Sequence, residues 1–115
     1  GLKKGPLCGF IWHQGEANGG TDPARYASML KGIRANIAAH ANAPNLPWVA
    51  GQTGITGNAN DNVARALVMI AASDPRFAWA SSSGLSLIDN VHYDARSQRL
   101  MGQRYAQKLV DVLKR

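Results

Sequence analysis

The sequence contains a single cysteine, Cys8, so no disulfide can form within the chain. This excludes the class of small secreted domains that disulfides hold together. Long hydrophobic runs are also missing: the longest, residues 67–72 and 77–80, are far shorter than the roughly 20 apolar residues of a membrane-spanning helix. No G-x-G-x-x-G or P-loop string follows an apolar run, which argues against a nucleotide-phosphate site. We therefore expect neither a disulfide framework nor a membrane partner.

Acidic residues are scarce: 7 Asp and Glu stand against 13 Lys and Arg, and the net charge is +6. Such a balance can mark a nucleic-acid-binding surface, but the cations must then cluster on one face. Here they are spread along the chain, with tight groups only at residues 3–4 and 114–115. We interpret them as solvated surface charge and expect no nucleic-acid partner. The alternative predicts salt-sensitive binding to DNA or RNA.

Apolar runs alternate with segments of helical periodicity. The runs at residues 7–12, 48–50 and 77–80 are typical of short buried strands. Helical spacing of apolar side chains follows each run, at residues 23–40, 61–73 and 95–115; in the first helix it includes Tyr26, Leu30, Ile33 and Ile37. This order predicts an α/β fold with a parallel sheet and helices on its faces. Because three strands are few and leave an edge unpaired, we expect the chain to be the C-terminal half of a larger layered domain.

Polar segments follow the predicted strands, at residues 13–16, at residues 51–54 and in the loop that contains residues 89–92. In open parallel sheets, ligands bind beyond the carboxyl ends of the strands. The topology alone therefore brings these three segments to the edge where a site is expected.

Asp89 and His92 form a D-x-x-H pair in the last of these segments. In a turn, this spacing can place both side chains on one side, so that the carboxylate accepts the Nδ1–H of the imidazole and Nε2 is free to act as a base. The alternative is a turn aspartate beside a surface histidine, with no chemistry. The position in a long loop at a strand end favours a functional role.

The string W-H-Q-G-E at residues 12–16 is the most unusual in the chain. The amide N–H₂ of Gln14 could donate to a developing oxyanion. Gly15 would let the backbone approach a substrate closely, and Glu16 could orient a neighbouring group or a substrate hydroxyl. The alternative is a polar cluster that only caps the edge of the sheet.

Together, W-H-Q-G-E, the string D-N-V-H-Y-D at residues 89–94 and the following S-Q-R-L-M-G-Q-R-Y-A-Q-K-L resemble the sialate O-acetylesterase and acetylxylan esterase group, carbohydrate esterase family six. This group belongs to the SGNH hydrolases, so the resemblance implies a flavodoxin-like, three-layer α/β/α sandwich. It also implies that His92 is the general base of a Ser-His-Asp triad and Asp89 its orienting acid. Gln14 would supply an oxyanion donor, and His13 and Glu16 would line the pocket. The implied substrate is an acetylated carbohydrate, and no cofactor or metal is implied.

The family's serine nucleophile lies in a G-Q-S-N-type motif upstream of W-H-Q-G-E, and nothing of this kind precedes Leu7. Residues 51–53 resemble the motif by letters only, with Thr53 in place of the serine, and residues 81–83 are better interpreted as a loop than as a nucleophile. We therefore expect residues 1–115 to be the C-terminal part of one esterase domain, with the serine on an upstream segment or companion chain. The alternatives are a non-catalytic carbohydrate-binding relative and an inert fragment. The compartment stays open, although the resemblance points to an extracellular or periplasmic location.

Overall fold

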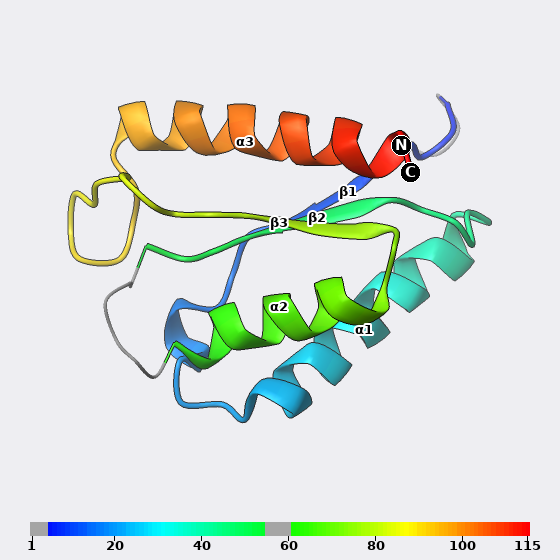
Figure 1. Ribbon diagram of the computed structural model, residues 1–115, viewed down its shortest axis with the longest axis horizontal. Helices are drawn as coiled ribbons and strands as arrows, with labels where there is room; N and C mark the ends of the chain where they lie inside the picture. Colours follow the sequence, from blue (N-terminus) through cyan, green and yellow to red (C-terminus); the bar gives the residue numbers. More distant parts are fainter. Residues whose placement is uncertain (1–4, 55–60) are drawn as a thin grey trace.

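The computed structural model describes residues 5–54 and 61–115 of the chain. Strands and helices alternate in the predicted order (Figure 1). The elements are β1 (Phe10–Trp12), the short 3₁₀ helix η2 (Glu16–Asn18), α1 (Pro23–His40), β2 (Trp48–Gly51), α2 (Asn62–Ser73), β3 (Phe77–Ala80) and α3 (Ala95–Leu113). Part of the loop expected after the second strand, residues 55–60, lies outside the described residues.

Each long helix begins after an aspartate that caps it. Asp22, Asp61 and Asp94 precede α1, α2 and α3, and each carboxylate accepts a backbone N–H from the first turn of its helix. These bonds satisfy donors that have no partner inside the helix. Strand β1 is shorter than predicted: its pairing begins at Phe10 opposite Trp48, because the preceding Pro47 has no N–H with which to continue the ladder.

The three strands form a parallel sheet in the order β1-β2-β3. Helices α1 and α2 cover one face and α3 covers the other (Figure 1). This arrangement confirms the predicted α/β/α layering. None of the helices in the described part of the chain is both long and apolar enough to cross a lipid bilayer.

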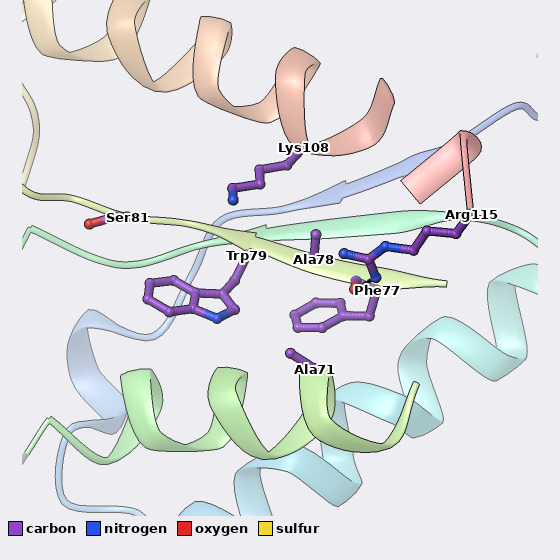
Figure 2. A pocket seen from close by; sticks show the side chains of 7 residues that line it. All are labelled: Ala71, Phe77, Ala78, Trp79, Ser81, Lys108 and Arg115. Carbon is purple, nitrogen blue, oxygen red and sulfur yellow. Dashed lines mark hydrogen bonds between the residues drawn. The ribbon is translucent and has the colours of Figure 1, made fainter. Parts of the chain in front are cut away.

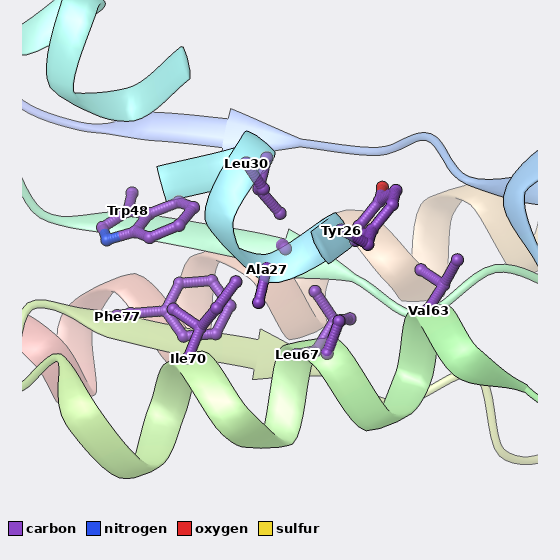
Figure 3. Packing of buried hydrophobic residues seen from close by; sticks show 10 residues of the cluster. Tyr26, Ala27, Leu30, Trp48, Val63, Leu67, Ile70 and Phe77 are labelled. Atoms are coloured by element: carbon purple, nitrogen blue, oxygen red, sulfur yellow. The ribbon is translucent and has the colours of Figure 1, made fainter. Parts of the chain in front are cut away.

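The main core lies between the sheet and the pair α1 and α2 (Figure 3). Trp48 and Phe77 on neighbouring strands are both fully buried, with ring centroids 4.3 Å apart. The indole N–H of Trp48 donates to Asp74 Oδ2 at 2.8 Å, so its polar atom is satisfied at the end of α2. Leu30 and Leu67 fill the space between the helices.

The predicted apolar face of α1 is only partly buried. Tyr26 and Leu30 are buried, whereas Ile33 is 37% exposed. The linker to β2 folds back on the other side of the helix, where Arg34 Nη2 donates to the backbone oxygen of Leu46. Ala38 is therefore the buried residue of the last turns.

Leu67 and Val68 provide a test of this packing. Leu67 is 1% exposed and Val68, the next residue on α2, is 52% exposed. We expect Leu67→Ala to lower the free energy of unfolding by about 2–5 kcal/mol, because it leaves a cavity in the core. Val68→Ala is the matched control and should change it by less than about 0.5 kcal/mol. Urea unfolding followed by circular dichroism measures both, and equal losses would contradict this placement of the core.

Candidate functional site

The segments that follow the three strands meet at one edge of the sheet (Figure 1). His13 follows β1, Gln52 follows β2, and the loop 81–94 follows β3. The rings of His13 and Tyr93 lie with centroids 5.6 Å apart, and the Tyr93 hydroxyl donates to the backbone oxygen of Gln52 at 2.7 Å. The convergence expected from the topology is thus observed as direct contacts.

Asp89 and His92 lie in a tight turn of the loop 81–94. An antiparallel bridge joins Leu87 and Tyr93, and the turn closes through Asn90, which has a φ of 68°. Asp89 Oδ1 accepts the backbone N–H of Val91 at 3.1 Å and that of His92 at 2.6 Å. Asp89 Oδ2 lies 2.6 Å from Nδ1 of the His92 ring. The same carboxylate therefore builds the turn and orients the imidazole.

These bonds shift the pKa of both side chains. The backbone N–H and the ring of His92 lower the pKa of Asp89 to about 2. In return, the hydrogen bond and the charge of Asp89 raise the pKa of His92 above its ordinary value. Because Asp89 is ionised at neutral pH, the His92 proton is held on Nδ1. Nε2 has no hydrogen-bond partner among the described residues, and the side chain is 68% exposed.

Gln14 lies in a loop held against α1. The hydroxyl of Tyr26 donates to the backbone oxygen of Gln14, 3.0 Å away. The side-chain amide of Gln14 donates to Asn18 Oδ1 at 2.9 Å. This bond uses one of the two N–H groups of the amide. The role of oxyanion donor stays a prediction for the other N–H.

Gly15 is buried, with a φ of 135° that disfavours any side chain. A Cβ at this position would lie 2.9 Å from Val63 Cγ1 and 3.1 Å from the Tyr26 hydroxyl. The glycine therefore allows the loop to pack closely on α1 and α2. Its predicted approach to a substrate stays a prediction.

Glu16 and His13 form a second pair at this edge. Glu16 Oε2 accepts the backbone N–H of Gly15 at 3.1 Å, and Oε1 lies 3.7 Å from His13 Nε2. Burial lowers the pKa of His13, and the charge of Glu16 opposes this shift, so the ring is neutral at pH 7. Glu16 also adds to the rise in the pKa of His92 that the Asp89 bond and charge cause. The W-H-Q-G-E and D-N-V-H-Y-D segments are therefore electrostatically coupled.

Two tyrosines of the site were not singled out from the sequence. Tyr105 was placed only on the apolar face of the last helix, yet its hydroxyl lies 2.6 Å from His13 Nδ1. Tyr93 contacts His13 and Gln52, as described above. With Met101 and other side chains, the two tyrosines line an apolar cavity of about 210 Å³ beside His13. The sequence could have indicated Tyr105, because a hydroxyl on an otherwise apolar helix face needs a hydrogen-bond partner when it is buried.

None of the described serines is hydrogen-bonded to His92. Ser97 Oγ accepts the backbone N–H of Ser86, Ser81 Oγ accepts that of Ser83, and Ser82 is buried. Within residues 5–54 and 61–115, no group of three or more His, Cys, Asp or Glu side chains lies close enough to hold a metal ion.

The Asp89–His92 bond leads to a prediction for the titration of His92. Asp89→Asn removes the charge that favours the imidazolium, so the pKa of His92 should fall toward or below 6.5. An NMR titration of the His92 ring protons measures this shift. Asp22→Asn is the matched control, because asparagine also caps helices and α1 begins away from His92. An unchanged His92 midpoint in Asp89→Asn would contradict the described pairing.

A comparison with protein families identifies the family of the chain. The family model described as "Carbohydrate esterase, sialic acid-specific acetylesterase" matches residues 2–111, which is nearly the whole chain. No curated protein matches the sequence. The match includes both W-H-Q-G-E and D-N-V-H-Y-D, the two segments that the fold brings together. The chain belongs to the carbohydrate esterase family of sialic acid-specific acetylesterases.

Proposed function

We propose that this chain carries the acid–base half of a serine-type carbohydrate O-acetylesterase. The hydrogen bond of 2.6 Å between Asp89 and His92 carries the proposal, since it leaves Nε2 free at the carboxyl edge of the sheet. The family match supports an esterase reaction, and the W-H-Q-G-E segment beside the pair supplies polar groups for a substrate. The substrate class is an acetylated sugar, with acetylated sialic acid and acetylated xylan as the two to compare.

Because the proton of neutral His92 is on Nδ1, Nε2 is the atom that acts as the base in the proposed reaction. Nε2 takes the proton of a serine hydroxyl as its oxygen attacks the acetyl carbonyl, and Asp89 stabilises the imidazolium that forms. The Gln14 amide donates to the oxyanion. The C–O bond to the sugar then breaks, and His92 returns the proton to the departing alkoxide. Water, deprotonated by His92, then attacks the acetyl-serine, and His92 returns this proton to the serine oxygen as the acyl bond breaks and acetate is released.

The nucleophile comes, in this proposal, from an upstream segment of the same protein or from a companion chain. Two observations support this source. No G-Q-S-N-type string stands before W-H-Q-G-E in the sequence, and none of the described serines is hydrogen-bonded to His92. The alternatives, a carbohydrate-binding relative without turnover and an inert fragment, are outcomes of the experiment below.

The outer edge of β3 is closed to a companion strand. Arg115 reaches from beyond the end of α3 and donates to the outward-facing backbone oxygen of Phe77 at 3.1 Å (Figure 2). At the other end of the strand, Arg104 Nη1 donates to the backbone oxygen of Ser81. Lys108 extends between them over a shallow groove that none of the predicted site residues lines (Figure 2). Charged side chains on an edge strand prevent pairing with another strand.

The edge of β1 is open in contrast. The N–H of Phe10 donates to the backbone oxygen of Pro47 beside β2, so in the parallel ladder the backbone of Ile11, the next residue, faces away from β2. The Ile11 side chain is 52% exposed, because α3 packs mainly on β2 and β3. We infer that the segment with the serine docks along β1, which would place it next to His13 and Gln14.

Histidine substitutions test the proposed base in the full-length protein. His92→Ala should lower kcat for an acetylated sugar by about 10²–10⁴-fold, because proton transfer from the serine is lost. His40→Ala is the control, since His40 lies at the end of α1, away from the carboxyl edge of the sheet. Acetate release measures both, and similar losses in the two variants would contradict the assignment of His92.

A fluorophosphonate probe with intact-mass detection tests the source of the serine. We expect the full-length protein or a companion chain to gain the probe mass upstream of W-H-Q-G-E, while residues 1–115 alone stay unlabelled. Label on residues 1–115 would contradict the proposed source. Sugar binding without label or turnover in the full-length protein would instead identify a carbohydrate-binding relative.

A further inference from the structure

We propose that Tyr105 is a positioning residue of this site: through His13, it fixes the Glu16 carboxylate at the edge of the sheet where the Asp89–His92 pair lies. The consequence for acetyl hydrolysis rests on the proposed function, whereas the arrangement itself stands on the geometry. None of these three residues contacts the nucleophile in the proposed reaction. They act on the Asp89–His92 pair without taking part in the proton transfer.

The contact between Tyr105 and His13 is short and closely fitted. The Tyr105 hydroxyl lies 2.6 Å from His13 Nδ1, although 92 positions separate the two residues. Both atoms lie in the space that a side chain at Gly51, the last residue of β2, would occupy. A Cβ at this glycine would overlap the hydroxyl and lie 2.6 Å from Nδ1. Three elements of the fold thus meet at this one hydrogen bond.

The surroundings of the His13 ring select one tautomer. Burial raises the pKa of Tyr105, and Tyr93 and Glu16 raise it further, so the phenol keeps its proton. If this hydroxyl donates to Nδ1, the proton of the neutral ring resides on Nε2 and points toward Glu16 Oε1, 3.7 Å away. The other tautomer would direct a lone pair at the carboxylate and leave the phenol proton without an acceptor. The first arrangement is therefore favoured.

Glu16 is held from two sides as a result. His13 Nε2–H faces one carboxylate oxygen, and the backbone N–H of Gly15 donates to the other at 3.1 Å. The Glu16 side chain is only 25% exposed, so solvent screens its charge less than that of a free surface carboxylate. The charge of Glu16 raises the pKa of His92 in addition to the larger effects of the Asp89 hydrogen bond and charge. A fixed Glu16 therefore adds to the stabilisation of the His92 imidazolium.

Histidine NMR tests this arrangement without any substrate. In the ¹⁵N-labelled chain, two-bond ¹H–¹⁵N correlations report the tautomer of His13, and a titration reports the midpoint of His92. We expect the Nε2–H tautomer in the wild type. Tyr105→Phe should weaken this preference and lower the His92 midpoint, because Glu16 is no longer held. Gly51→Ala, which displaces the hydroxyl, should act in the same direction.

Two controls separate positioning from general structure. Tyr93→Phe keeps the ring against His13 but removes a different hydroxyl, and Gly102→Ala adds a methyl where no atom lies within 4 Å. Both should leave the His13 tautomer unchanged. An Nδ1–H tautomer in the wild type would overturn the inference, and so would an unchanged His92 midpoint in a folded Tyr105→Phe. If Gly51→Ala does not fold, Tyr105→Phe decides alone. Absence of acetylesterase activity would overturn the proposed function and leave this inference standing.

Discussion

The carboxylate of Asp89 is the group on which the site depends. It accepts two backbone N–H groups, from Val91 and His92, and it bonds the His92 ring. Three such bonds stabilise the ionised carboxylate, which is why its pKa falls to about 2. Since Asp89 is ionised at every pH where His92 titrates, the ring keeps its orientation in both protonation states. In the proposed reaction His92 gains and loses a proton, so the orientation of its ring must be the same in both protonation states.

The two edges of the sheet differ in which side chains cover them, and this difference determines where a further strand can be added. Guanidinium groups close the outer edge of β3, whereas Ile11 leaves the edge of β1 apolar and open. A sheet of three strands has little buried area of its own, so an open apolar edge next to the site favours completion on that side. In the proposed assembly, Arg104 and Arg115 therefore direct the missing segment to the edge of β1.

Much of the architecture could be predicted because its determinants are local. Apolar runs and helical spacing placed the helices and strands to within a few residues, and the D-x-x-H spacing placed Asp89 beside His92. Tyr105 could not be placed in the same way, because helical spacing showed only which face it shares. Its partner is 92 positions away, and the glycine that makes room for the contact is on a third element. Helical spacing likewise placed Ile33 on one face of α1 with Leu30, but its exposure of 37% depends on which other parts of the chain pack on that helix.

The position of Glu16 explains how the pKa of His92 can be shifted although the Asp89–His92 pair is exposed. Asp89 and His92 are open to solvent, which screens their mutual attraction. Glu16 and His13 are more protected, and close packing around Gly15 and Gly51 holds them there. The site therefore combines an accessible imidazole with a more protected carboxylate. In the proposed reaction, the imidazole must contact a nucleophile, and the carboxylate stabilises the imidazolium without blocking that contact.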